Sequence, residues 1–256
     1  MRTKSIGFIG GGRITKIFLQ ALKDVVFTSI KVCDTNENTL VNLKENFPQI
    51  ETTSSISELA GQDLILIALH PPVIREVANE IAEIISDETL LISLAPKFTI
   101  EILSKLIPTK QIVRIIPNAT SIINRGYNPV CFSEDILPKN KNLILDMLEI
   151  MGEYVQTDEE KLEAYAIASA MLPTYFWFQW HEMELIAQKM GLTSKESMET
   201  VYETLKASLD LMYHSKLGFE GVNDLIPIKP LADKETVIKD AFNENLITLY
   251  QKIKPS

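Results

Sequence analysis

The sequence predicts an α/β protein in which a mostly parallel sheet is followed by an all-helical domain. Two observations carry this prediction. Short apolar runs of four to six residues alternate with amphipathic helical stretches through the first 155 residues, and from about Thr157 to Ser215 no strand-like alternation is visible. Apolar runs of this length are typical of strands covered on both faces. Because strand, helix and strand alternate, we expect crossover connections and parallel pairing.

Each of five apolar runs predicts one strand. The predicted strands are Ser5–Ile9, Ser29–Cys33, Asp63–Ala68, Thr89–Leu94 and Gln111–Ile116. Helical spacing of apolar residues predicts helices between them, for example from Ile14 to Leu22 and from Ile74 to Ile85. At roughly 150 residues per domain, a chain of 256 residues favours two domains.

The rest of the chain shows helical patterns without strand patterns. Asp158 and the two glutamates after it predict an N-cap and an acidic first turn. Gly191 predicts a helix end and restart, and Gly218–Pro230 predicts a loop with two prolines. Apolar spacing predicts a last helix from about Lys234 to Ile253. The expected domains are 1–157, which is α/β, and 158–256, which is helical.

Charge and composition exclude several classes of protein. Asp and Glu number 34 against 25 Lys and Arg, so the net charge is −9, opposite to that of a protein that neutralises nucleic-acid phosphates. The most apolar stretch, Ala164–Phe178, is shorter than the roughly 20 residues of a membrane-spanning helix. Cys33, Cys131 and three scattered histidines predict neither a disulfide framework nor a metal site. We therefore expect a cytoplasmic protein with no nucleic-acid or membrane partner.

A glycine-rich turn follows the first predicted strand and opens the first predicted helix. Gly10 and Gly12 occupy the first two positions of the pattern G-x-G-x-x-G/A, with Thr15 at the third. Gly10 permits a tight turn, and Gly12 lets a pyrophosphate approach the helix N-terminus, where Arg13 and Ile14 follow. The turn predicts a Rossmann-type dinucleotide site; the alternative is an ordinary strand-to-helix turn.

Asp34 bears on which dinucleotide binds. It ends the second predicted strand, 24 residues after Gly10, where a Rossmann-type site places its ribose-binding carboxylate. At an effective dielectric near 20, a 2′-phosphate about 4 Å away would be repelled by roughly 4 kcal/mol. No Arg or Lys lies between Thr35 and Leu43 to offset this charge, so Asp34 favours NAD over NADP. Arg13, a cation in a first helical turn, fits either a pyrophosphate or a 2′-phosphate. The alternatives are an Asp34 that only caps the loop and an Arg13 that is only solvated.

Several later segments match one family in order and spacing. The chain resembles the pyrroline-5-carboxylate reductase family in Gly7-Phe-Ile-Gly-Gly-Gly-Arg-Ile, Ala68-Leu-His-Pro-Pro, Ser93-Leu-Ala-Pro-Lys, Arg114-Ile-Ile-Pro-Asn-Ala-Thr with Gly126, and Gly152-Glu with Asp158-Glu-Glu-Lys-Leu. Together these segments extend over nearly the whole chain. The resemblance implies a reductase that transfers hydride from NADH or NADPH to the C=N carbon of a small cyclic imino acid, yielding proline.

The resemblance also implies roles for individual residues. The residues it places around the cofactor are Gly10, Gly12, Arg13, Ile14, Asp34, Thr35, Ala68, Leu69, His70, Pro71, Ala95 and Pro96. The residues it places near the substrate are Asn118, Ser169, Pro173 and Tyr175. Histidine side chains ordinarily exchange protons near neutral pH, as a general acid must, which makes His70 the candidate catalytic residue; a loop histidine that only touches ribose is the alternative.

The helical half departs from the family pattern. Pro173 and Tyr175 of the family's S-G-S-G-P-A-Y segment remain, but both glycines are replaced. The family's S-P-G-G-T-T loop, which binds the substrate carboxylate, has no counterpart in the stretch Leu225–Asp233. Lys97 and Lys229 are candidate replacement anchors, and for each the alternative is a surface lysine. Two other functions stay open: a non-catalytic dinucleotide-binding regulatory protein, and a reductase of a different small keto or hydroxy acid.

An aromatic cluster predicts how the helical domain is covered. Tyr175–Trp180 holds five aromatic residues among six. A helix that is apolar on every side has to be buried on every side. We expect a homodimer through the helical domain, as the resemblance also implies; a monomer with an aromatic core is the alternative.

Overall fold

The computed structural model of the protein describes residues 4–255. These residues form two compact units. The first comprises 4–170 together with 249–255 and holds a sheet, and the second comprises 171–248 and is helical. The predicted boundary at residue 157, between a dinucleotide-binding domain and a helical domain, stays a prediction.

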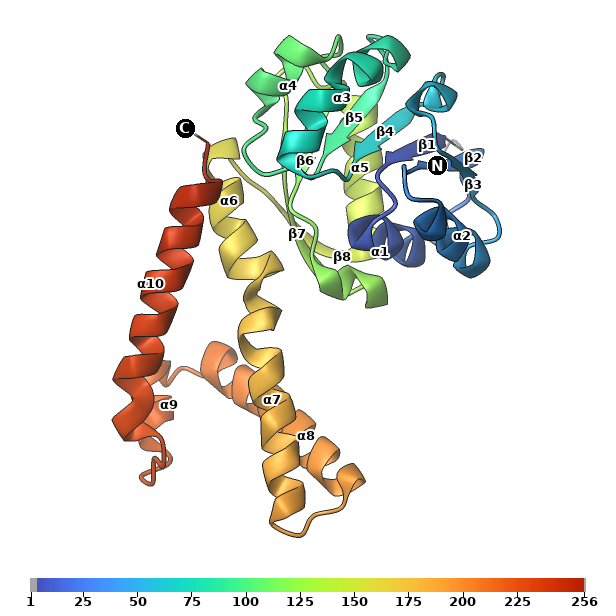
Figure 1. The fold of residues 1–256 in the computed structure, drawn as a ribbon. Helices are drawn as coiled ribbons and strands as arrows, with labels where there is room; N and C mark the ends of the chain where they lie inside the picture. Colours follow the sequence, from blue (N-terminus) through green and yellow to red (C-terminus); the bar gives the residue numbers. More distant parts are fainter. Residues whose placement is uncertain (1–3, 256) are drawn as a thin grey trace. The chain divides into compact units, whose positions relative to one another are not determined.

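An eight-stranded sheet forms the centre of the first unit (Figure 1). Its strand order is β3-β2-β1-β4-β5-β6-β7-β8, and every neighbouring pair is parallel except β6 and β7. The strands are β1 Ser5–Ile9, β2 Ser29–Cys33, β3 Glu51–Thr53, β4 Leu64–Ile67, β5 Leu90–Ser93, β6 Ile112–Ile115, β7 Gly126–Phe132 and β8 Gly152–Gln156. The predicted fold class, a Rossmann-type and mostly parallel sheet followed by helices, is confirmed.

Helices cover both faces of the sheet. Phe18 of α1 and Leu148 of α5 pack into the core on one face, and Ile74 of α3 and Leu103 of α4 pack into the core on the other. The helices of the first unit are α1 Arg13–Ala21, α2 Glu37–Asn46, α3 Pro71–Ile84, α4 Ile100–Leu106, α5 Pro138–Met151 and α6 Leu162–Tyr165. Because helices shield both faces, the central strands are buried along their whole length, as their continuous apolar runs predicted.

The second unit is built from longer helices. These are α7 Leu172–Lys189, α8 Ser194–His214, α9 Gly218–Asp224 and α10 Glu235–Ile253, of which the last turn belongs to the first unit. Gly191, with φ of +104°, ends α7 as predicted. Thr193 and Glu196 then form a reciprocal capping box that starts α8.

One local prediction is confirmed and another is wrong in part. Asp158 is the N-cap of a helical stretch with an acidic first turn, as predicted, although its side chain binds Lys161 Nζ at 2.6 Å and does not cap the backbone. The stretch consists of a 3₁₀ turn over Glu159–Lys161, the short α6 and a π-helical turn over Ala166–Ala170. The stretch Gly218–Pro230 is not a loop throughout, because its first part is α9. Both of its prolines lie after Asp224, so they leave the backbone donors of α9 intact.

None of the helices in residues 4–255 is long and apolar enough to cross a membrane. Within the same range, no three His, Cys, Asp or Glu side chains gather as they would to hold a metal ion.

Candidate functional site

The carboxyl ends of β1, β4 and β5 meet at one edge of the sheet. Gly10 donates its N–H to the Cys33 carbonyl at 2.8 Å, and Ala68 donates to the Ile9 carbonyl at 2.8 Å, so the segments after β1 and β4 begin side by side. The chain order reverses at β1, which lies between β2 and β4. In open α/β sheets, ligands bind in the crevice at such a reversal, beyond the carboxyl ends of the strands.

Gly10 is required by the backbone at this edge. Its φ is +100°, a region that L side chains rarely adopt. A Cβ built on it would also lie 2.6 Å from the Ala68 carbonyl oxygen. The fully buried Thr15 donates its hydroxyl to the Gly10 carbonyl. Thr15, at the third position of the glycine pattern, therefore closes the turn through a hydrogen bond.

Gly12 shapes a cradle for an anion. It is the N-cap of α1, it is exposed, and a Cβ built on it would meet no atom within 4 Å. The first turn of α1 has no acidic residue and no side-chain cap. Its N–H groups and the helix dipole therefore favour a negative group in that space. The adjacent Arg13 is exposed and forms no ion pair with any residue from 4 to 255. This chemistry fits a pyrophosphate.

Asp34 ties the glycine turn to the end of β2. Its Oδ2 accepts the Gly11 N–H at 2.7 Å, and its Oδ1 accepts the Asn36 N–H at 2.8 Å. Gly11, which the motif did not single out, is packed so closely that a Cβ would lie 2.9 Å from Leu43 Cδ1. Asp34 does therefore cap the loop, and each of its oxygens keeps a further lone pair for ribose hydroxyls. Thr35 beside it is exposed.

Substitution of Asp34 tests the predicted preference of the protein for NAD over NADP. Asp34→Asn keeps the side-chain shape and one acceptor but removes the charge. We expect the ratio of the Kd for NADPH to the Kd for NADH to fall at least about tenfold, equivalent to about 1.4 kcal/mol. Titration of both cofactors against both proteins measures this ratio. An unchanged ratio would show that the Asp34 charge does not face the 2′ position.

The loops after β4 and β5 extend the same edge. His70 is the exposed N-cap of α3, which begins at Pro71, and its imidazole makes no capping hydrogen bond. Leu69 is half-buried. Ala95 is buried and Pro96 is half-buried after β5. The structure thus brings the cofactor-bordering segments predicted after β1, β4 and β5 to one edge.

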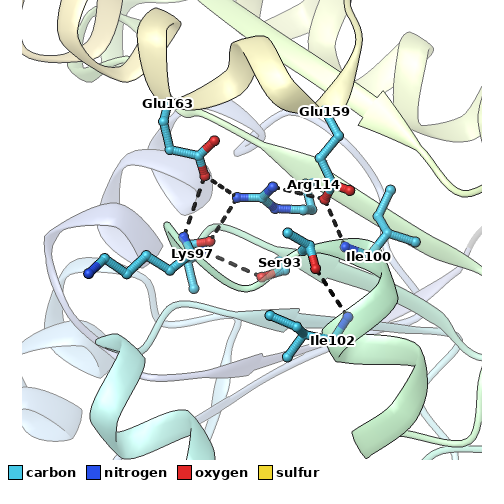
Figure 2. Close-up of polar contacts among 9 residues, drawn as sticks. Ser93, Lys97, Ile100, Ile102, Arg114, Glu159 and Glu163 are labelled. Atoms are coloured by element: carbon cyan, nitrogen blue, oxygen red, sulfur yellow. Dashed lines mark hydrogen bonds and ion pairs between the residues drawn. The ribbon is translucent and has the colours of Figure 1, made fainter. Parts of the chain in front are cut away.

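A buried ionic cluster lies beneath the loop after β5 (Figure 2). Arg114 of β6 donates from Nη1 to Glu159 Oε1 at 2.8 Å and from Nη2 to Glu163 Oε1 at 2.6 Å. The side chains of Arg114 and Glu163 are 2% and 0% exposed. The neighbouring carboxylates raise the pKa of Arg114 against the opposing effect of burial. Glu163 Oε2 is buried without a hydrogen-bond partner among the described residues. The sequence prediction assigned these three residues no role.

The predicted substrate residues are divided between the two units. In the first, Asn118 Nδ2 donates to Ser169 Oγ at 3.1 Å, and Ser169 Oγ donates to the Tyr127 carbonyl at 3.0 Å. In the second, Pro173 and Tyr175 lie in the first turn of α7, and the ring of Tyr175 meets Phe242 edge-on at 5.9 Å. Their proximity to the substrate stays a prediction.

Neither cysteine has the chemistry of a nucleophile. Burial is the largest cause that raises the pKa of Cys33 to about 11, with nearby carboxylates adding to it. Burial likewise raises the pKa of Cys131 to about 12. Both thiols are buried and free, which is typical of core packing.

Known proteins resemble this chain in sequence. The family model described as "NADP oxidoreductase coenzyme F420-dependent" matches residues 5–97. Pyrroline-5-carboxylate reductase from Haemophilus influenzae is 26% identical over 80% of this chain and 77% of its own length. Pyrroline-5-carboxylate reductase 2 from Bacillus subtilis is 24% identical over 83% of this chain and 78% of its own length.

Solved structures share the fold. Plasmodium falciparum pyrroline carboxylate reductase, with NADP bound, has a TM-score of 0.80 at 20% identity and covers 99% of this chain and 96% of its own. The enzyme from Streptococcus pyogenes has a TM-score of 0.79 at 16% identity, with 99% and 97% covered. Prephenate dehydrogenase from Aquifex aeolicus is less similar, with a TM-score of 0.56. The sequence relatives confirm the predicted resemblance to the pyrroline-5-carboxylate reductase family.

Proposed function

We propose that this protein is an NAD(P)H-dependent oxidoreductase that reduces the C=N bond of a small cyclic imino acid, pyrroline-5-carboxylate to proline or a related imine. The observation that carries the proposal is the cradle at Gly12, which offers unpartnered helix-terminal donors and open space where a dinucleotide pyrophosphate fits. The names of the sequence relatives supply the substrate class.

Different residues at the sheet edge bind different parts of the cofactor. Gly12, Arg13 and Ile14 bind the pyrophosphate, while Asp34 and Thr35 bind the adenosine ribose, with NAD favoured by Asp34. When bound, the nicotinamide supplies the hydride. Ala68, Leu69, His70 and Pro71 after β4, with Ala95 and Pro96 after β5, would border it. With hydride added to the imine carbon and one proton to the imine nitrogen, the imine, NAD(P)H and H⁺ would give the amine and NAD(P)⁺.

His70 is the candidate source of that proton. It is exposed at the edge between β4 and α3, and it is not engaged as a helix cap. A histidine exchanges protons near neutral pH, which suits a general acid. Asn118, Ser169, Pro173 and Tyr175 are the residues proposed to surround the substrate.

We also propose that the protein forms a homodimer and is located in the cytoplasm. In the second unit, Trp177 and Phe178 of α7 are 47% and 68% exposed. An apolar groove of about 480 Å³ lies beside them, between α7 and α10, and Phe242 is part of its wall. Exposed aromatic surface of this kind is typical of protein interfaces. The two free cysteines suit a reducing compartment.

Steady-state oxidation of NADH and NADPH tests the function. With pyrroline-5-carboxylate as substrate, we expect turnover that depends on both the imine and the dinucleotide, and proline as the product. Related cyclic imines and small keto acids serve as comparison substrates. Tight cofactor binding without turnover of any of them would contradict an enzyme and favour a dinucleotide-binding regulatory protein.

A further inference from the structure

Lys97 has an unusual backbone conformation at the edge of the site. It lies in the loop between β5 and α4 with φ of +67°, in the left-handed region. Among residues 4–255, Asn124 is the other non-glycine residue with positive φ, and asparagine tolerates that region. For a lysine the left-handed conformation is unfavourable, so its surroundings have to stabilise it.

The loop around Lys97 forms hydrogen bonds with the ionic cluster beneath it. Arg114 Nη2 donates to the Ala95 carbonyl at 3.3 Å, while Glu163 Oε1 accepts the Lys97 N–H at 3.4 Å (Figure 2). Glu159 Oε1 accepts the Ile100 N–H at 2.7 Å. The loop thus forms hydrogen bonds with the cluster before, at and after Lys97, through Ala95, Lys97 and Ile100.

Apolar packing holds the far side of the loop. Phe98 is 2% exposed and packs in the core on that face of the sheet. The guanidinium of Arg75 lies over its ring, 5.3 Å from the centroid. Phe98 is therefore buried, whereas its neighbour Lys97 is exposed.

The Lys97 ammonium is left available by this arrangement. The side chain is exposed, and its Nζ forms no ion pair or hydrogen bond with any other residue that the structure describes. It extends away from the two carboxylates (Figure 2). Across the sheet edge, Arg13 is the cation at the end of β1, where the pyrophosphate fits, and Lys97 is the cation beyond β5.

We propose that Lys97 binds the carboxylate of the imino-acid substrate, and that the ionic cluster holds the loop so that its ammonium faces the site. This inference rests on the proposed function. A protein with a net charge of −9 repels small anions in general, so an anionic substrate needs a local cation. Hydrogen bonds to a charged group contribute about 1.5–3 kcal/mol, equivalent to roughly 10- to 150-fold in binding.

Two substrates that differ in the carboxylate test the contact between the Lys97 ammonium and that group. Pyrroline-5-carboxylate and 1-pyrroline share the imine ring, but only the first carries a carboxylate. For Lys97→Met we expect the KM for pyrroline-5-carboxylate to rise about 10- to 100-fold, with kcat/KM for 1-pyrroline within twofold of the wild type. Lys97→Arg should retain much of the preference for the carboxylated ring. Lys105→Met, which removes an exposed lysine of α4 paired with Glu101, is the matched control. It should change the KM and the kcat/KM of neither substrate.

Lys97→Gly separates binding from folding. Glycine adopts the left-handed region without strain, so this variant should unfold at the same or a higher temperature and still lose the carboxylate preference. The Lys97 proposal is overturned, while the proposed function stands, if Lys97→Met keeps the wild-type KM for pyrroline-5-carboxylate. It is also overturned if the variant lowers kcat/KM equally for both substrates. If the wild type turns over neither imine, both are overturned.

Discussion

Replacement of Arg114 by methionine is expected to lower the free energy of unfolding by about 3–5 kcal/mol. Arg114 pairs with Glu159 and Glu163 in a site where its own side chain is 2% exposed. Without the guanidinium, Glu163 becomes a fully buried carboxylate with no cation beside it, and Glu159 loses its partner. Such a loss is a large share of the roughly 5–15 kcal/mol that holds a typical domain folded. Denaturant unfolding followed by circular dichroism measures the change.

Two further variants test whether charge is the cause. Arg114→Met combined with Glu159→Gln and Glu163→Gln removes the unpaired charges and should recover most of the lost stability, because neutral side chains of similar size replace a buried ionic group at little net cost. Arg125→Met removes an exposed arginine and should change stability by no more than about 0.5 kcal/mol. A loss below about 1 kcal/mol in the Arg114 single variant would contradict the account of the cluster.

Gly12→Val is expected to weaken dinucleotide binding at least about 100-fold, equivalent to roughly 2.8 kcal/mol. A Cβ built at Gly12 meets no atom within 4 Å beyond its neighbours in the chain, so the valine side chain extends into the space proposed for the pyrophosphate. Valine is a poorer N-cap than glycine, and we expect a loss of stability of no more than about 1 kcal/mol. Fluorescence titration with NADH measures binding, and thermal unfolding measures stability.

Gly10→Ala provides the contrasting variant in the same turn. Here the Cβ would lie 2.6 Å from a carbonyl oxygen, on a backbone with positive φ, so the fold itself should be destabilised. Gly12→Val should therefore lose binding while keeping the fold, whereas Gly10→Ala should lose stability. If Gly12→Val binds NADH within threefold of the wild type, the cradle is not the pyrophosphate site.

The sequence predicted the parts of the sheet that carry a continuous apolar run. All five strands predicted from such runs are present, because helices on both faces of a sheet favour strands that are mostly apolar. The missed strands lack this pattern. β3 has three polar residues, β7 contains Pro129, which argues against a strand, and β8 is only partly buried.

The ionic cluster could not be predicted from local pattern. Arg114 lies 45 and 49 residues from its two partners along the chain. Glu159 and Glu163 are four residues apart, a spacing that is typical of a solvated helix face. Only the packing of residues 158–170 against the end of the sheet turns these carboxylates inward. The glycine turn was predictable because its required backbone conformation is local.

Thermal unfolding of the wild type with NADH, with NADPH and with no ligand tests the central claim most directly. A ligand at 100 times its Kd stabilises the folded protein by about 2.7 kcal/mol. For a chain of this size that corresponds to a rise in Tm of roughly 5–10 °C. The account predicts such a rise with a dinucleotide, larger for NADH than for NADPH because of Asp34, and none in Gly12→Val. An unchanged Tm with both dinucleotides at millimolar concentration would contradict it.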